Sequence, residues 1–147
     1  MEDLIDAIRT RIVASASLWI DTPFAHQQRV RQVGVDCAGL VVAVGQSIGF
    51  KIHDHPRRDY SRYPVVGRTL EAMCNEQLDR VKAAQPGSVY LFWVRKKGAP
   101  QHLGIATRPG YMIHAWADPG KTLQSPLGKY WKERVHAIYD FRFGQVM

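Results

Sequence analysis

The chain has 147 residues, of which 46% are hydrophobic, and this is enough to build one domain with a real core, which excludes a disordered chain. Its formal net charge of +7 favours contact with a polyanion, whether nucleic acid, an anionic cell-wall polymer or an acidic partner subunit. The two cysteines, Cys37 and Cys74, form no Cys-x-x-Cys pair, so neither a zinc site nor a disulfide scaffold is expected. We expect one compact unit without a metal or another cofactor.

The first segment, residues 1–17, is predicted to be an amphipathic helix. Charged residues interrupt its apolar positions, which is unlike the apolar core of a secretory signal peptide. No other stretch is long and apolar enough to cross a bilayer, so no membrane span is expected. We therefore expect a protein that is made in the cytoplasm without a signal peptide. A polar, basic loop over residues 21–34 follows.

Cys37 stands where this loop turns into a strongly apolar helix that continues to Ile48, with Gly49 after it. Asp36 can cap the helix, and the nearly continuous apolar run indicates that the helix is buried. Amide N–H groups in a first helical turn carry a partial positive charge, so they favour a thiolate over a thiol. Cys37 is therefore a candidate nucleophile, and its backbone N–H is a candidate oxyanion donor. The alternative is that Cys37 is a small buried hydrophobic residue.

The rest of the chain contains an irregular segment, a helix and several strands. Residues 51–64 are predicted to be irregular. Residues 67–83 are predicted to form a helix in which Cys74 is a packing residue. The Pro86-Gly87 turn marks a change to strands, which are predicted over residues 88–95, 102–107, 111–117 and 136–143. Helices first and an antiparallel meander second indicate an α+β fold, in which the buried helix packs on an antiparallel β-sheet.

Two histidines, His102 and His114, lie in one predicted hairpin. If residues 108–110 form a three-residue loop, Gly104 lies opposite His114, and the two imidazoles are diagonal neighbours on one face, near enough to hydrogen-bond. A two-residue loop would instead place them on opposite faces. Gly104 is expected to leave room for another group or a substrate backbone. Trp116 can form a wall near His102.

Cysteine, histidine and a third polar group are the minimal machinery for thiol-dependent acyl transfer. His102 would take the proton from Cys37 and return it to the leaving amine, while His114 accepts a hydrogen bond from His102 and fixes its tautomer. The alternative is that both are ordinary sheet histidines.

Two other patterns carry less weight. His53-Asp54-His55 has the residue types of a metal site but lacks a third ligand at a suitable spacing, so no metal is expected there. The basic residues lack the accompanying aromatic and glycine pattern of a nucleic-acid module, so nucleic acid is not the expected partner.

Several motifs resemble those of the NlpC-type cell-wall cysteine peptidases, which are compact papain-like enzymes. They are Gly34-Val35-Asp36-Cys37-Ala38-Gly39-Leu40-Val41, Pro86-Gly87 before Val89-Tyr90-Leu91-Phe92, His102-Leu103-Gly104-Ile105, and Met112-Ile113-His114-Ala115. A further motif, Thr22-Pro23-Phe24-Ala25-His26-Gln27, is similar to the short single-domain members encoded by tailed bacteriophages and gene transfer agents. Phe24 stands where many members have tyrosine, and Ser88 stands where aspartate is frequent.

The resemblance implies a single papain-like NlpC-type domain over residues 1–147. It implies an endopeptidase that hydrolyses peptide bonds in peptidoglycan stem peptides, with Cys37, His102 and His114 as catalytic residues. It also implies a component of a phage tail tip, made in the host cytoplasm, which contacts other tail-tip proteins and acts at the host cell wall. The expected substrate cleft residues are Phe24, Asp36, Gly104 and Trp116. The rival hypothesis is a structural tail-tip subunit that keeps the fold while its site is idle or blocked.

Overall fold

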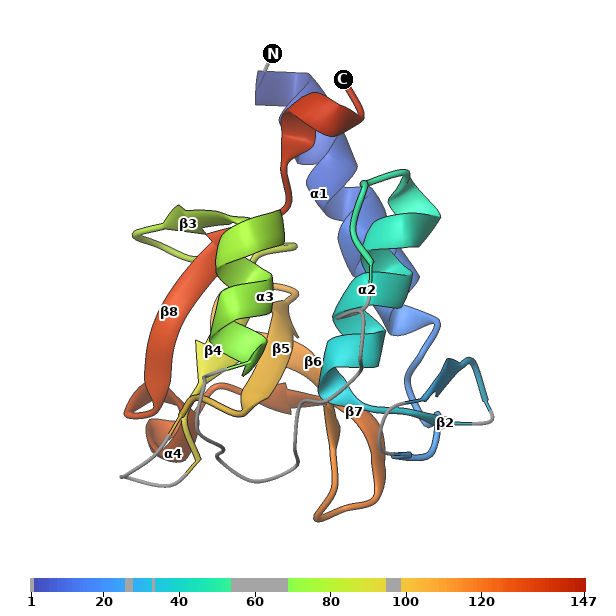
Figure 1. The fold of residues 1–147 in the computed structure, drawn as a ribbon, viewed down its shortest axis with the longest axis vertical. Coiled ribbons are helices and arrows are strands. Elements are labelled where there is room, and N and C mark those ends of the chain that lie inside the picture. The colour runs from blue at the N-terminus through green and yellow to red at the C-terminus, as the bar shows by residue number, and fades with distance from the viewer. Residues whose placement is uncertain (1, 26–27, 33, 54–68, 95–98) are drawn as a thin grey trace.

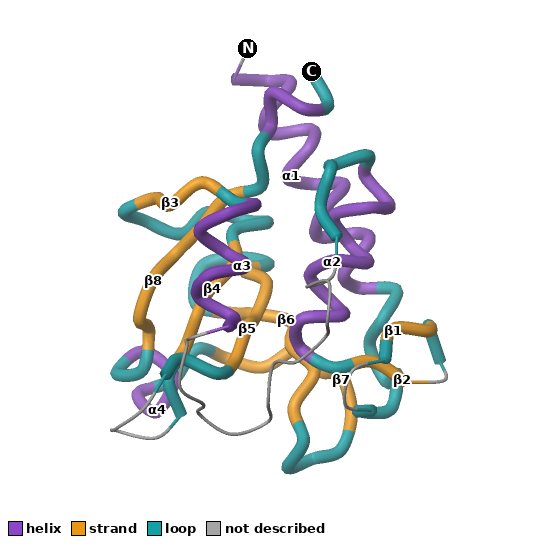
Figure 2. The backbone as a smooth tube through the Cα atoms, viewed as in Figure 1, coloured by secondary structure: helices purple, strands orange, loops and turns teal. Residues whose placement is uncertain are grey.

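The computed structural model describes residues 2–25, 28–32, 34–53, 69–94 and 99–147. Most helical residues precede most of the strands along the chain (Figures 1 and 2). The elements in chain order are α1 (Glu2–Ser17), β1 (Arg29–Val30), β2 (Gly34–Val35), α2 (Cys37–Ile48), α3 (Thr69–Gln77), β3 (Asp79–Val81), β4 (Val89–Phe92), β5 (His102–Ala106), β6 (Tyr111–Trp116), β7 (Lys121–Pro126), α4 (Lys129–Lys132), β8 (Val135–Asp140) and the 3-10 helix Phe143–Gln145.

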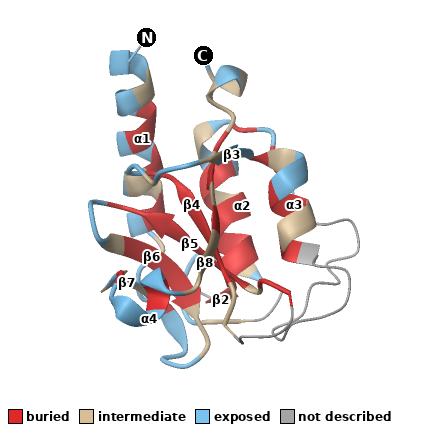
Figure 3. Cartoon of the chain, turned by 90° about the vertical axis from the view of Figure 1, so that its left-hand side faces the viewer, coloured by how far each residue is buried: buried red, intermediate tan, exposed pale blue. Residues whose placement is uncertain are grey.

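Six strands form one antiparallel sheet in the order β3-β8-β4-β5-β6-β7, while β1 and β2 form a separate two-stranded ribbon. Helices α1 and α2 pack together and cover one face of the sheet, and α4 lies on its other side (Figure 3). This is the α+β architecture predicted from the order of the segments, with a buried helix on an antiparallel sheet.

Each face of the sheet has its own apolar cluster. The larger cluster lies between α1, α2 and the sheet and includes Leu40 and Leu103. The smaller cluster lies between the sheet and α4 and includes Phe92 and Trp131. Because successive side chains of a strand point to opposite faces, His102, which precedes Leu103 in β5, points toward the smaller cluster.

Helix α2 begins and ends where the sequence predicts. The Asp36 carboxylate accepts a hydrogen bond from the Gly39 N–H at 2.8 Å, which caps the first turn, and Gly49 ends the helix with φ +108°. Gly39 is also needed for packing, because a Cβ there would lie 2.5 Å from the main-chain oxygen of Gln28. The main chain at Gln28, just before β1, can therefore pack in direct contact with the first turn of α2.

The hairpin between β5 and β6 has the predicted three-residue turn. Ile105 pairs with Ile113, so the strands are joined across residues 108–110 and the two-residue alternative is excluded. Continued along the strands, this register places the side chains of His102 and His114 on the same face of the sheet.

Several elements differ from the prediction. The helix ends at Gln77 instead of residue 83, because Asp79–Val81 pairs with β8 as an edge strand, and this pairing overrides the local helical pattern. Strand β7 and helix α4 lie where neither was predicted. The last strand ends at Asp140, and residues 143–145 form a 3-10 helix.

Some predicted features lie outside the described residues. They are His26 and Gln27 of the Thr22 motif, Asp54 and His55 of the candidate metal pattern, residues 54–64 of the irregular segment, residues 67–68 of the predicted helix, and residue 95 of the first predicted strand.

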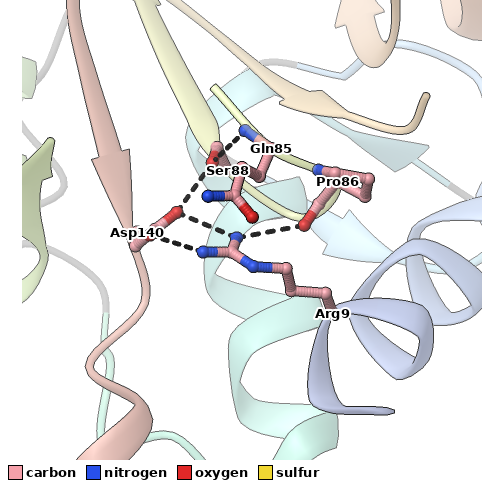
Figure 4. A network of polar contacts seen from close by, with 5 residues as sticks. All are labelled: Arg9, Gln85, Pro86, Ser88 and Asp140. Atoms are coloured by element: carbon pink, nitrogen blue, oxygen red, sulfur yellow. Dashed lines mark hydrogen bonds and ion pairs between the residues drawn. The ribbon is translucent and has the colours of Figure 1, made fainter. Parts of the chain in front are cut away.

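A buried polar network joins α1 to the sheet (Figure 4). Arg9 donates to both carboxylate oxygens of Asp140, at 2.8 and 3.2 Å, and to the main-chain oxygen of Pro86 at 3.2 Å. Ser88 Oγ donates to Asp140 Oδ1 at 2.7 Å and accepts from the Gln85 N–H at 3.0 Å. Ser88 therefore links the turn before β4 to β8.

Candidate active site

Cys37 is the first residue of α2, and its side chain lies in the larger apolar cluster with 8% of the residue exposed. The thiol is 4.0 Å from the main-chain oxygen of Gln101, the residue before His102. The Leu103 amide is near enough to stabilise the thiolate form. The sulfur therefore lies against the main chain on both sides of His102.

The resting thiol is neutral. Burial, together with the charge of the neighbouring Asp36 carboxylate, raises the pKa of the Cys37 thiol to about 12, although the amides of Leu103, Ala38 and Cys37 itself act in the opposite direction. The prediction that the helix start holds a thiolate is therefore wrong for this state, because desolvation and the capping carboxylate outweigh the partial charge of the amides. To act as a nucleophile, Cys37 would have to lose this proton.

His102, His114 and Ser125 form a chain of hydrogen bonds. His102 Nε2 lies 2.8 Å from His114 Nδ1, and His114 Nε2 lies 2.9 Å from Ser125 Oγ. Since Nε2 of His102 is engaged, Nδ1 is the nitrogen left to accept a proton from Cys37. A neutral imidazole carries one N–H, so this role requires His102 to donate through Nε2 and His114 to donate through its own Nε2.

Aromatic rings enclose both imidazoles. The His102 ring stacks on Trp131 with a centroid distance of 5.1 Å and meets the edge of Trp116 at 4.7 Å. His102 is 3% exposed, and burial lowers its pKa well below the ordinary value, with the neighbouring His114 acting in the same direction. Within the described part of the chain, no hydrogen bond joins Cys37 to either imidazole. The structure thus joins the two histidines and places Cys37 beside the main chain of one of them.

The expected cleft residues differ in their contacts. Trp116 is half-buried and contacts the His102 ring, as a cleft wall would. Phe24 is half-buried and bridges to Val35, two residues before Cys37. Asp36 is buried and serves as the helix cap, so its carboxylate presents almost no surface to a substrate.

The fourth expected cleft residue, Gly104, does not border open space. A Cβ at this position would lie 2.6 Å from Met112 Sδ and 3.5 Å from the Phe92 ring. Of the two alternatives expected for the room beside Gly104, another group and a substrate backbone, the structure shows the first, because Met112 of the neighbouring strand fills the space. The expectation that Gly104 lines a substrate cleft is therefore wrong. Glycine is needed here for close packing beneath the histidines.

Ser125 was missed because no strand was predicted between residues 117 and 136. A signal was present, since the turn-forming run Asp118-Pro119-Gly120 is followed by a stretch that can extend as β7. In the structure Leu123 pairs with His114, so Ser125, two residues further on, shares the face of His114. The register of β7 therefore brings the hydroxyl to the imidazole.

Stability should fall as the pH drops from about 6.5 toward 4. Burial lowers the pKa of His114 to about 4, so over this range the unfolded chain binds a proton that the folded chain excludes. His114 alone then removes about 3 kcal/mol of stability by pH 4. Urea unfolding measured between pH 7 and pH 4.5 should show the free energy of unfolding falling with pH. In His114→Asn this fall should be smaller, because the part that His114 contributes is absent. The exposed His53→Asn variant serves as the control; equal slopes in all three proteins would contradict the prediction.

The NlpC/P60 family profile matches residues 21–140, which is most of the chain, so this chain belongs to the NlpC/P60 family. Similar solved structures include the NlpC/p60 domain of the peptidoglycan hydrolase SagA, with 22% identity, a TM-score of 0.61, and coverage of 90% of this chain and 98% of that one. NlpC2 from Trichomonas vaginalis has 18% identity and a TM-score of 0.69, over 91% of this chain and 46% of that one. An NlpC/P60 family protein from Bacillus cereus ATCC 10987 has 18% identity and a TM-score of 0.63, over 90% of this chain and 40% of that one.

These likenesses show the fold, and they confirm the predicted papain-like NlpC-type architecture. The chain spans less than half the length of the Trichomonas and Bacillus chains. Among curated proteins, none matches this chain in sequence. No helix in the described ranges has the length and apolar character needed to cross a membrane. Among the same residues, no three His, Cys, Asp or Glu side chains gather as metal ligands would.

Proposed function

We propose that this chain is a cysteine endopeptidase that hydrolyses peptide bonds in the stem peptides of peptidoglycan. The proposal depends chiefly on the position of Cys37, which starts a buried helix and lies against the main chain of His102, whose ring is hydrogen-bonded to His114. Membership of the NlpC/P60 family supports the class of reaction. The name of SagA, a peptidoglycan hydrolase, supports the class of substrate.

In this mechanism Cys37 Sγ attacks the scissile carbonyl carbon while its proton passes to His102 Nδ1. The thiol lies against the Gln101 oxygen in the larger cluster, whereas the His102 ring faces the smaller cluster. This step therefore requires the two side chains to move toward each other. The Cys37 N–H belongs to the first helical turn, whose amides have no partner within the helix, so it can stabilise the oxyanion. His102 protonates the leaving amine and then activates the water that releases the acyl group. Thiolate and imidazolium form together, and their attraction in the poorly solvated site offsets part of the cost of charging them.

The second candidate function is a structural subunit with an idle site. Two observations favour it: His102 is 3% exposed among aromatic rings, and the thiol is hydrogen-bonded to a main-chain oxygen instead of an imidazole. In that case the same fold contributes packing surfaces only.

Digestion of purified peptidoglycan, followed by mass spectrometry of the released muropeptides, separates the two functions. A peptidase creates a new amino terminus and a new carboxyl terminus within the stem peptide, and the masses of the products identify the bond. A wild-type protein that releases no product from peptidoglycan would reject the enzyme and favour the structural subunit.

We also propose that the protein belongs to the tail tip of a phage or phage-like particle and aids penetration of the host cell wall. The resemblance of residues 22–27 to short phage-encoded members supports this, and the net charge of +7 suits an anionic wall polymer or an acidic tail partner. Mass spectrometry of purified particles should detect the chain in fractions that contain tails. Its absence from such particles would reject the tail role without affecting the proposed peptidase.

A further inference from the structure

We infer that Ser125 is a positioning residue of this site, which acts through His114 to keep His102 able to hold the proton from Cys37. The inference deepens the proposed function and rests on it. Among the hydrogen bonds of the described residues, the Ser125 hydroxyl is joined to His114 and to neither Cys37 nor His102, so its role must pass through the outer imidazole.

The sheet brings the three groups together by register. His102 and His114 are diagonal neighbours across β5 and β6, and Ser125 is a diagonal neighbour of His114 across β6 and β7. The two hydrogen bonds measure 2.8 and 2.9 Å. His114 is 2% exposed, whereas Ser125 is half-buried, so the hydroxyl forms the outer end of a chain that leads into the core.

The reaction allows only one arrangement of protons along this chain. When His102 carries the proton from Cys37, both of its ring nitrogens are donors, so His114 must accept at Nδ1. A neutral His114 then carries its own hydrogen on Nε2, and Ser125 Oγ is the acceptor 2.9 Å away. Without Ser125, this Nε2–H of the buried His114 loses its partner in the protein, which costs free energy in the charged state.

The same hydroxyl also acts on the charge itself. Each hydrogen bond in a chain polarises the next, so an acceptor beyond His114 makes His114 Nδ1 a better acceptor for the imidazolium of His102. The positive charge of His102 exists only after the proton has moved. Ser125 should therefore influence the rate of the chemical step more than the binding of substrate.

Ser125→Ala should lower kcat about tenfold while leaving KM nearly unchanged, because the side chain contacts the imidazole and not the substrate. Ser125→Thr keeps a hydroxyl and should restore most of the rate. Gln124→Ala is the matched control, because Gln124 is exposed and points away from the histidines on the same strand. A KM effect without a kcat effect, or equal loss in the alanine and threonine variants, would overturn the assignment.

Nitrogen-15 NMR of the imidazoles tests the inference without any need for activity. In the wild-type protein near pH 7, His114 should carry its hydrogen on Nε2, and in Ser125→Ala a share of the protein should shift to the Nδ1–H tautomer. A wild-type His114 protonated on Nδ1, or identical tautomers in the two proteins, would overturn the inference. If wild-type protein cleaves no peptidoglycan, the proposed peptidase fails, but these spectra still decide whether Ser125 sets the tautomer.

Discussion

Replacing Cys37 with alanine should abolish the release of muropeptides, with kcat/KM falling by at least about 10⁴-fold. In the proposed mechanism the substitution removes the sulfur that would form the acyl intermediate, and neither histidine could take its place. Only one heavy atom is lost from a side chain that already lies in the apolar cluster, so the fold should lose about 1 kcal/mol at most. Mass spectrometry of digests and thermal unfolding of the same preparations measure the two effects.

Cys74→Ala is the matched control for this experiment, because it removes the other buried thiol from helix α3. Its activity should remain close to that of the wild type. Hydrolysis that survives in Cys37→Ala but is lost in Cys74→Ala would show that Cys74 is the required thiol, which would contradict the prediction. Hydrolysis that survives in both would show that no thiol is required.

Replacing Arg9 with methionine should lower the free energy of unfolding by about 3–5 kcal/mol. Arg9 is 7% exposed and donates twice to Asp140, so its loss leaves a half-buried carboxylate with Ser88 as its remaining hydrogen-bond donor in this network. The Pro86 oxygen loses a donor as well. Methionine fills much of the same volume, so the loss in the free energy of unfolding comes mainly from the missing charge. Urea unfolding at pH 7 measures the effect.

Arg11→Met provides the control, because Arg11 is exposed on the same helix and its replacement changes the net charge equally. It should change stability by less than about 0.5 kcal/mol. The double variant Arg9→Met/Asp140→Asn should be less destabilised than the sum of its single variants, since the unpaired carboxylate is then absent. If Arg9→Met is as stable as Arg11→Met, the network does not hold α1 to the sheet.

The hairpin that carries both histidines was predictable apart from the length of its turn, because its information is local. Alternating side chains on two strands and the turn across residues 108–110 set a register that puts His102 and His114 on one face. Helix α2 was predictable for a similar reason, since Asp36 before an apolar run and Gly49 after it mark the two ends within a few residues.

Strand pairing across long sequence separations was not predictable in the same way. Asp79–Val81 is a strand because β8, almost sixty residues later, offers its edge, and no local pattern in that segment carries this information. The partner of His114 depends likewise on the position of β7. The space beside Gly104 depended on which side chain of the neighbouring strand pointed toward it, and Met112 fills it.

By itself the sequence determined the helix that begins at Cys37 and the hairpin that carries both histidines, because caps, apolar runs and short turns act between neighbouring residues. The observed strand register then decided the turn length that pairs His102 with His114. Only the tertiary structure decided the protonation of the thiol, the enclosure of His102 by Trp116 and Trp131, and the link to Ser125. Desolvation and contacts between distant strands depend on how the whole chain packs, and the amide groups at a helix start are too weak to override that burial.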